Sequence, residues 1–145
     1  WRSNFLVYQN FFSQKQPLTW SEHSQWWQSR PSSWRKFIIC LNENSVERPV
    51  GVVHLGQLEY WSPEIGYFIG EVSLWGKGYG REAVNQAVGW LKEHGYTACH
   101  TTVLKTNERS IRLLKSLGFQ EGQPAREGEV YYIRRLLIEN LQTPA

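Results

Sequence analysis

Strand-like runs of apolar residues recur along the chain, each bounded by polar, glycine or proline positions. They span residues 35–41, 50–58, 64–69, 99–103 and 130–133. A polar turn from Asn42 to Ser45 joins the first two runs, which predicts an antiparallel hairpin. The third run leads into a glycine-rich stretch, and we place it at the centre of the predicted sheet.

Three other segments have helical spacing. Between residues 81 and 94 the apolar side chains fall at positions i, i+3, i+4 and i+7, and Gly95 supplies the stop. A second helix is predicted over residues 107–117, where Gly118 ends it, and a short one over residues 20–28. Because strands and helices are interleaved in this order, the pattern predicts a mixed α/β or α+β domain.

The short helix is unusual because most of its apolar side chains are aromatic. Thr19 and Glu22 have the spacing of a capping box at its start. The aromatic stripe consists of Trp20, His23, Trp26 and Trp27. Two interpretations stay open: the rings pack on the core, or some of them line a substrate slot. In the second case Trp20 and Trp27 are the candidate substrate-binding residues.

Size and composition fit a single domain over residues 1–145, with 41% hydrophobic and 20% charged residues. A chain of this length needs no metal or disulfide to hold a core, so we expect no metal site. Its two cysteines, Cys40 and Cys99, indicate a reduced, cytoplasmic setting. The longest apolar run, residues 37–41, is too short to span a membrane. Because the chain opens at Trp1 and contains no Met, we expect that an N-terminal strand is missing.

The segment before the helix of residues 81–94 has glycine at alternate positions, namely Gly76, Gly78 and Gly80. Such spacing lets successive N–H groups point in one direction, and the following helix adds the positive end of its dipole. Lys77 and Arg81 add positive charge. The segment predicts a phosphate-binding loop, with a plain connecting turn as the alternative. The net charge of +3 also favours an anionic ligand, but the sequence lacks the clustered Lys and Arg residues of a protein that binds nucleic acid.

Four segments together carry a more specific pattern: Glu64 to Tyr67, Trp75 to Ala83, Asn107 to Leu114, and Leu117 to Phe119. In order and spacing they resemble the GNAT superfamily of acetyl-CoA-dependent N-acetyltransferases. Within it, the chain is most similar to the branch of ribosomal-protein-alanine acetyltransferases. The resemblance implies a mixed, mostly antiparallel central sheet with two splayed parallel strands, flanked by helices.

The resemblance also implies acetyl-CoA as the co-substrate. The loop N–H groups would hold the CoA pyrophosphate, and the end of the third strand would hold the pantetheine arm together with Asn107, which equally suits a helix N-cap. The residues assigned in this way are Phe68, Ile69, Gly70, Gly76, Lys77, Gly78, Tyr79, Gly80, Arg81, Asn107 and Ser110. Trp75 replaces the family's usual Gln or Arg, which leaves a backbone site intact.

The implied reaction is direct transfer of the acetyl group to a primary amine, which needs a base for the amine and an acid for the departing thiolate. Glu64 is the candidate base, with a structural ion pair as its alternative role. His54 and His100 are further candidates for the base. The acceptor stays open between a small molecule, an amino sugar and a protein N-terminus, and a homodimer is one oligomeric state that we keep in view.

The acid is harder to assign, because Leu114 stands where many members carry a proton-donating tyrosine. Ser110 is our candidate, although it also suits a close approach of CoA; Tyr131 and Tyr132 are alternatives. Cys99 has no neighbour that marks it as an activated nucleophile. Leu114 therefore keeps a second function open, in which the domain binds CoA without catalysis and acts as a sensor or partner domain.

Overall fold

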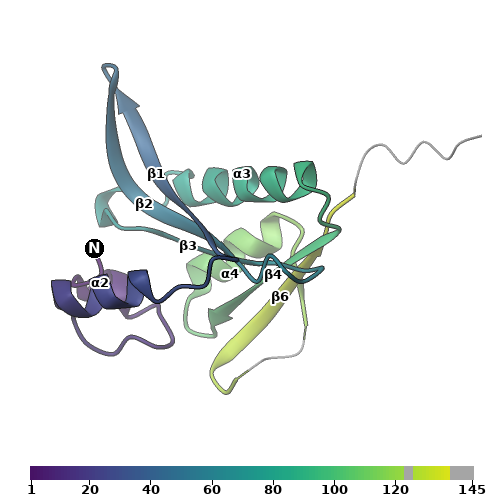
Figure 1. The fold of residues 1–145 in the computed structure, drawn as a ribbon, viewed down its shortest axis with the longest axis horizontal. Coiled ribbons are helices and arrows are strands. Elements are labelled where there is room, and N and C mark those ends of the chain that lie inside the picture. Colours follow the sequence, from purple (N-terminus) through teal and green to yellow (C-terminus); the bar gives the residue numbers. More distant parts are fainter. Residues whose placement is uncertain (123–125, 138–145) are drawn as a thin grey trace, which may run out of the picture.

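A six-stranded sheet organises the molecule, and the computed structural model describes it over residues 1–122 and 126–137. The strands are β1 (Arg35–Glu43), β2 (Val46–Gly56), β3 (Glu64–Ile69), β4 (Ala98–Leu104), β5 (Gln120–Glu121) and β6 (Glu129–Arg135). Their order is β1-β2-β3-β4-β6-β5, and every neighbouring pair is antiparallel except β3 and β4 (Figure 1). The predicted mixed, mostly antiparallel sheet is confirmed, with β3 near its centre.

The hairpin of β1 and β2 is longer than its apolar pattern predicts. Its turn consists of Asn44 and Ser45, whose φ angles are 53° and 65°. Two consecutive positive φ angles match the right-handed twist of a tight hairpin, and Asn tolerates such an angle well. The strands therefore pair from Glu43↔Val46 onward, and the hairpin extends past the helices in Figure 1.

The parallel strands β3 and β4 separate almost at once. Their register holds a single pair, Glu64↔His100, whereas β4 pairs with β6 from Ala98↔Arg135 to Leu104↔Glu129. The splayed parallel strands are thus confirmed. Beyond Glu64, the edge of β3 that faces β4 has no ladder partner among the described residues.

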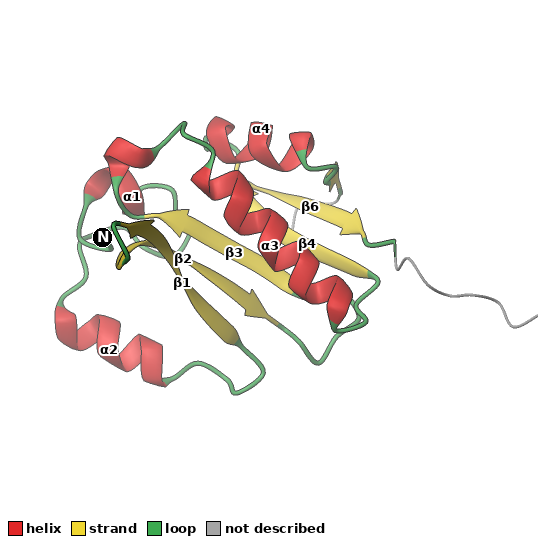
Figure 2. Ribbon diagram, turned by 90° about the horizontal axis from the view of Figure 1, so that it is seen from above, coloured by secondary structure: helices red, strands yellow, loops and turns green. Residues whose placement is uncertain are grey.

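Five helical segments accompany the sheet: α1 (Phe5–Tyr8), α2 (Trp20–Gln28), the 3-10 turn η1 (Val72–Leu74), α3 (Tyr79–Glu93) and α4 (Glu108–Ser116). Figure 2 shows α3 lying across the strands, with α4 beside it and α2 standing to one side. Leu91 of α3 and Leu114 of α4 join Ile65 and Cys99 of the sheet in one buried core. None of the helices in the described residues is long and apolar enough to cross a bilayer.

The helix ends follow the local sequence signals. Thr19 Oγ1 accepts a bond from the N–H of Glu22 at 3.3 Å, and Glu22 Oε2 accepts one from the N–H of Thr19 at 2.8 Å, so the capping box is confirmed. Gly95 and Gly118 follow α3 and α4 with φ angles of 82° and 79°. After Gly118, the N–H of Phe119 donates to the carbonyl of Leu114 at 3.1 Å, which closes α4.

Two features differ from the sequence-based expectation. Helix α2 has no buried residue, and Trp20 on it is 81% exposed, so the interpretation of its rings as core residues is wrong. The helix presents them to a cavity instead of to the sheet. The short elements α1 and β5 were also not predicted, because four and two residues are too few to produce a periodic pattern.

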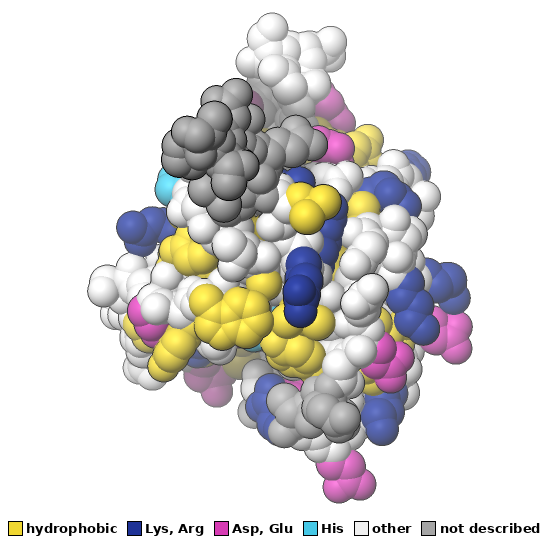
Figure 3. Space-filling view, turned by 90° about the vertical axis from the view of Figure 1, so that its right-hand side faces the viewer, with side chains coloured by type: hydrophobic (Ala, Val, Ile, Leu, Met, Phe, Trp, Pro, Cys, Tyr) yellow, Lys and Arg dark blue, Asp and Glu magenta, His cyan; other side chains and the backbone are white. Residues whose placement is uncertain are grey.

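The face of the molecule seen in Figure 3 carries hydrophobic patches among interspersed basic and acidic side chains. On that face, the described residues form no continuous stripe of positive charge. A nucleic-acid backbone would need such a stripe.

Candidate functional site

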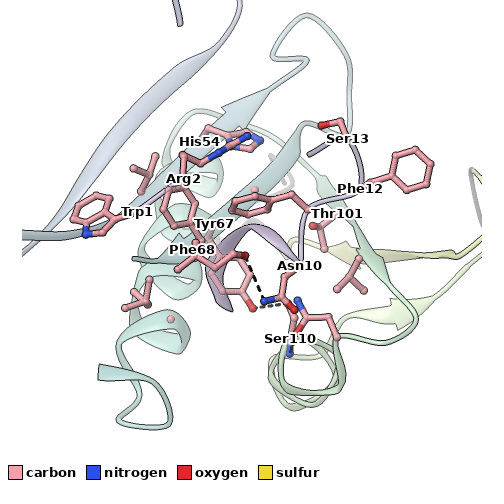
Figure 4. A pocket seen from close by; sticks show the side chains of 18 of the residues that line it. Trp1, Arg2, Asn10, Phe12, Ser13, His54, Tyr67, Phe68, Thr101 and Ser110 are labelled. Atoms are coloured by element: carbon pink, nitrogen blue, oxygen red, sulfur yellow. Dashed lines mark hydrogen bonds between the residues drawn. The ribbon is translucent and has the colours of Figure 1, made fainter. Parts of the chain in front are cut away.

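A cavity of about 1280 Å³ joins the glycine loop to the aromatic N-terminal segment. Its walls come from α2, β1, β2, β3 and β4, from the start of α3 and from α4. Figure 4 shows some of the lining side chains from the N-terminal segment, β2, β3, β4 and α4. Ligand pockets usually measure about 300–1,000 Å³, so this one has room for two ligands side by side. The predicted site residues that line it are Trp20, Trp27, Glu64, Phe68, Ile69, Gly76, Gly78, Tyr79, Gly80, Arg81, Asn107 and Ser110.

Two assigned residues, Gly70 and Lys77, do not line the cavity. Gly70 is buried beneath the ring of Trp1, which a Cβ at this position would overlap. Lys77 is exposed on the loop. The sequence could not show either placement, because both depend on packing between distant segments.

The glycine loop has the backbone that an anion site requires. Gly76 and Gly78 have φ angles of 76° and 91°, and a Cβ at either position would meet no atom within 4 Å. Gly78 is the N-cap of α3 and forms no side-chain cap, so the first N–H groups of the helix have no side-chain acceptor there. The loop is braced by Arg81, whose Nη2 donates to Ser116 Oγ of α4 at 2.7 Å.

The floor of the cavity next to the glycine loop lies where β3 and β4 diverge. The indole N–H of Trp75 donates to the carbonyl of Ile69 at 2.8 Å, and the guanidinium of Arg109 lies 4.2 Å from the centre of a Trp75 ring. Asn107 caps α4 by accepting a bond from the N–H of Ser110 at 3.3 Å. Its role as an N-cap is therefore confirmed, and its side chain also lines the cavity.

Ser110 shares a hydrogen bond with a residue that the sequence motifs do not mark as functional. The hydroxyls of Tyr67 and Ser110 lie 2.7 Å apart, and Figure 4 shows them facing one another across the cavity floor. Burial raises the pKa of the Tyr67 phenol, so this hydroxyl keeps its proton at neutral pH. Tyr67 is the last residue of the sequence motif that starts at Glu64, but the motif does not show that its hydroxyl contacts α4. Only the folded structure shows this contact.

Leu114 is fully buried in the core and offers no proton to the cavity. The alternative donors also lie away from it. Tyr132 is 1% exposed within the core, and the ring of Tyr131 stacks on His100 at 5.1 Å. Neither tyrosine lines the cavity, so the Tyr67–Ser110 pair is the hydroxyl pair that the structure brings to this position.

The candidate bases differ in position. Glu64 lines the cavity and accepts a hydrogen bond from Gln57 Nε2 at 3.4 Å, and its carboxylate forms no ion pair within the described part of the chain. His100 does not line the cavity, and its Nδ1 donates to the carbonyl of Ser62 at 2.8 Å. Cys99 is completely buried, and this burial raises the pKa of its thiol to about 12. Such a thiol is inert as a nucleophile.

His54 lines the cavity between the sheet and the aromatic segment. Its ring stacks on Trp34, with 4.9 Å between the ring centres, and lies across Gly66, where any Cβ would overlap it. Burial, assisted by Arg30 and Arg2, lowers the pKa of His54 to about 4. The imidazole is therefore neutral at pH 7.

The opposite end of the cavity is a wall of aromatic rings and cations. The guanidinium of Arg2 lies 4.4 Å from the ring centre of Phe11, and that of Arg30 lies 4.3 Å from a ring of Trp26. Trp20 and Trp27 line the same end, which is compatible with their predicted role in substrate binding. The arrangement can hold an anion at the loop and a second molecule against the rings, with hydroxyl groups between them.

Comparisons with known proteins show what the chain is similar to. The chain matches the model of a family described as "Acetyltransferase (GNAT) domain" over residues 1–120. An uncharacterized protein of Methanocaldococcus jannaschii is 48% identical over 132 residues, which are 91% of this chain and 27% of that protein. The chain thus spans about a quarter of the length of this curated relative.

Solved structures show the same fold. A domain from Methanocaldococcus jannaschii superposes with a TM-score of 0.89 at 47% identity, covering 94% of this chain and 88% of that one. A spermidine N-acetyltransferase from Vibrio cholerae, solved with CoA and spermine, superposes with a TM-score of 0.77 at 17% identity, over 93% of this chain and 85% of that one. At this lower identity the likeness concerns the fold alone.

Proposed function

The chain belongs to the GNAT acetyltransferase family, and from this premise we propose that it binds acetyl-CoA and transfers the acetyl group directly to a primary amine. One observation carries the proposal: a single cavity holds the glycine loop at one end, the aromatic wall at the other, and the Tyr67–Ser110 hydroxyls at its floor. Two substrates that enter from opposite ends would meet beside these hydroxyls.

The residues present suit the CoA end of this reaction. The N–H groups of residues 76–81 would bind the pyrophosphate, because the left-handed glycines and the start of α3 leave these donors without side-chain acceptors. The free edge of β3 at Phe68 and Ile69, together with Asn107, would bind the pantetheine arm through hydrogen bonds. Acetyl-CoA supplies an acyl group on sulfur, which leaves as a thiolate.

Two groups would move protons. Glu64 would take a proton from the amine, directly or through a water molecule, so that the nitrogen can bond to the acyl carbon as the carbon–sulfur bond breaks. Ser110 would give its proton to the thiolate and receive one from Tyr67. Tyr67 would then regain a proton from solvent and become neutral again. A thiol has a pKa near 8.5, so a hydroxyl pair needs to supply only modest assistance.

We place the protein in the cytoplasm, which fits its two free thiols, Cys40 and Cys99. A single domain over residues 1–145, a homodimer and the similarity to the ribosomal-protein-alanine branch stay predictions. Residues 123–125 and 138–145 lie outside the described part of that domain.

The direct test is turnover of acetyl-CoA by the purified protein, followed as release of free thiol with a panel of primary amines. We expect Glu64→Gln and Tyr67→Phe each to lower kcat by about 10²- to 10⁴-fold while CoA affinity stays within twofold, because general acid–base groups contribute this much. Tyr67→Phe combined with Ser110→Ala should cost little more than the larger single effect, because the two hydroxyls act as one unit.

Tyr131→Phe is the matched control, since it removes the same hydroxyl from a tyrosine outside the cavity lining. It should leave kcat unchanged. A parent protein that binds CoA tightly and acetylates no amine would contradict the catalytic proposal and favour the sensor function. Full activity in the double variant would contradict only the role of the hydroxyl pair and would leave the rest of the catalytic proposal standing.

A further inference from the structure

Three cations gather at the aromatic end of the cavity, where each is held by rings. Arg2 and Arg30 lie over Phe11 and Trp26, and Lys36 Nζ lies 4.1 Å from the centre of a Trp27 ring. All three side chains line the cavity and are half-buried. Contacts with ring faces orient the cationic groups while leaving N–H donors at their edges.

The described residues place no carboxylate against these cations. The ion pairs of this part of the chain are Arg48 with Glu43 and Glu71, Arg112 with Glu108, and Arg126 with Glu129. The acidic residues that line the cavity are Glu64 and Glu129, and Glu129 is already bound to Arg126 at 2.8 Å. Burial lowers the pKa of Arg2 and of Lys36, and the nearby positive charge of Arg30 lowers both further.

Hydrogen bonds hold two of the three cations in place. Gln14, which is 5% exposed, accepts a bond from Arg2 Nε at 2.7 Å. Lys36 Nζ donates to the carbonyl of Trp27 at 3.1 Å. Two buried polar atoms beside them, His23 Nδ1 and Arg30 Nε, have no hydrogen-bond partner within the described residues. A prearranged set of donors with unused hydrogen-bonding capacity is what an anionic ligand requires.

We propose that Arg2, Arg30 and Lys36 bind an anionic group of the acceptor, a phosphate or a carboxylate, so that the substrate is an amine that carries negative charge. This inference rests on the acetyltransferase function proposed above and specifies its acceptor class. A polycation such as spermine would meet repulsion from all three side chains. Guanidinium groups match the geometry of phosphate and carboxylate oxygens.

Calorimetric titration of the CoA-saturated protein with inorganic pyrophosphate and, separately, with citrate tests this. Saturation with CoA fills the glycine loop, so further anion binding reports the aromatic end. We expect at least one probe to bind, and the probe that binds more tightly identifies the anionic group as phosphate or carboxylate. Arg30→Gln should weaken this binding about 10- to 100-fold, because hydrogen bonds to charged groups contribute on this scale. Binding should also weaken as the salt concentration rises. Spermine should not bind.

Arg35→Gln is the matched control, because Arg35 neighbours Lys36 on β1 and does not line the cavity. It should keep the parent affinity. The melting temperature of Arg30→Gln should equal or exceed that of the parent, since the change relieves repulsion; a cation with only a structural role would lower it. Absence of anion binding, or binding that Arg30→Gln leaves unchanged, would overturn the inference.

The two proposals fail in different ways. If CoA does not bind, the proposed function fails, and a titration of the free protein still reveals an anion site that depends on Arg30. If CoA binds and amines are acetylated while the anion titrations are flat, only the assignment of an anionic acceptor is wrong.

Discussion

At the scale of single residues, the chemistry of the site depends on side chains that meet from distant parts of the chain. Tyr67 on β3 and Ser110 on α4 are 43 positions apart and share a 2.7 Å hydrogen bond. Gly80, in the first turn of α3, gives the Tyr67 ring room, because a Cβ there would lie 3.3 Å from it, closer than ordinary van der Waals contact. In the proposed function, the Tyr67 hydroxyl, which reaches the cavity from the sheet, would serve in place of a hydroxyl at Leu114.

His54 predicts a measurable dependence of stability on pH. Its pKa is about 4 in the folded protein and about 6.5 in an unfolded chain, so between these values only the unfolded state binds the proton. Stability from this group is fully present above pH 6.5 and is lost as the pH falls toward 4. We expect the free energy of unfolding to drop by about 2 kcal/mol more in the parent than in His54→Gln between pH 7 and pH 5.

Urea unfolding at the two pH values measures this difference. His94→Gln serves as the control, since His94 is exposed and lies outside the cavity lining. Equal pH dependence in the parent and in His54→Gln would show that the His54 ring is solvated rather than held neutral between Trp34 and Gly66.

At the scale of elements, the loop before α3 allows a sharp test of backbone geometry. Gly78 and Gly95 flank the same helix, both with left-handed φ angles and both with open space where a Cβ would stand. Valine should strain the two positions similarly, by about 1–3 kcal/mol. Only Gly78→Val should also abolish CoA binding, because it displaces N–H groups of the loop.

Equilibrium titration with CoA and thermal melting of the two variants give the comparison. We expect similar melting temperatures and a loss of affinity confined to Gly78→Val. Equal CoA affinity in both variants would remove the loop from the binding site.

Elements with strong local signals were predictable from the sequence. Helix α2 lies at Trp20–Gln28 as expected, because the Thr19 capping box and Pro31 act within one turn of its ends. The site was predictable only where a motif is continuous along the chain, as in the loop of residues 76–81. The burial of Gly70 under Trp1 and the partnership of Tyr67 depend on contacts between segments that no local pattern encodes.

At the scale of the whole molecule, residues 1–34 and the motif-bearing region enclose one cavity together. Neither part encloses the cavity alone: the loop and α4 supply one end, and the aromatic segment supplies the other. The N-terminal segment is anchored through aromatic contacts, with Phe11 and Trp1 packed against Phe68 at ring distances of 5.3 Å and 6.1 Å. Strand β3 thus contributes to both ends of the cavity. Its Phe68 contacts the N-terminal segment, and its Tyr67 contacts Ser110 of α4.

A crystal structure of the protein with bound CoA tests the central claim most directly. The account predicts the pyrophosphate against the N–H groups of residues 76–81, the pantetheine arm along the free edge of β3, and the thiol beside the hydroxyls of Tyr67 and Ser110. The aromatic end, with Arg2, Arg30 and Lys36, should stay open for the acceptor. CoA bound at the aromatic end, or with its thiol away from the Tyr67–Ser110 pair, would contradict the account.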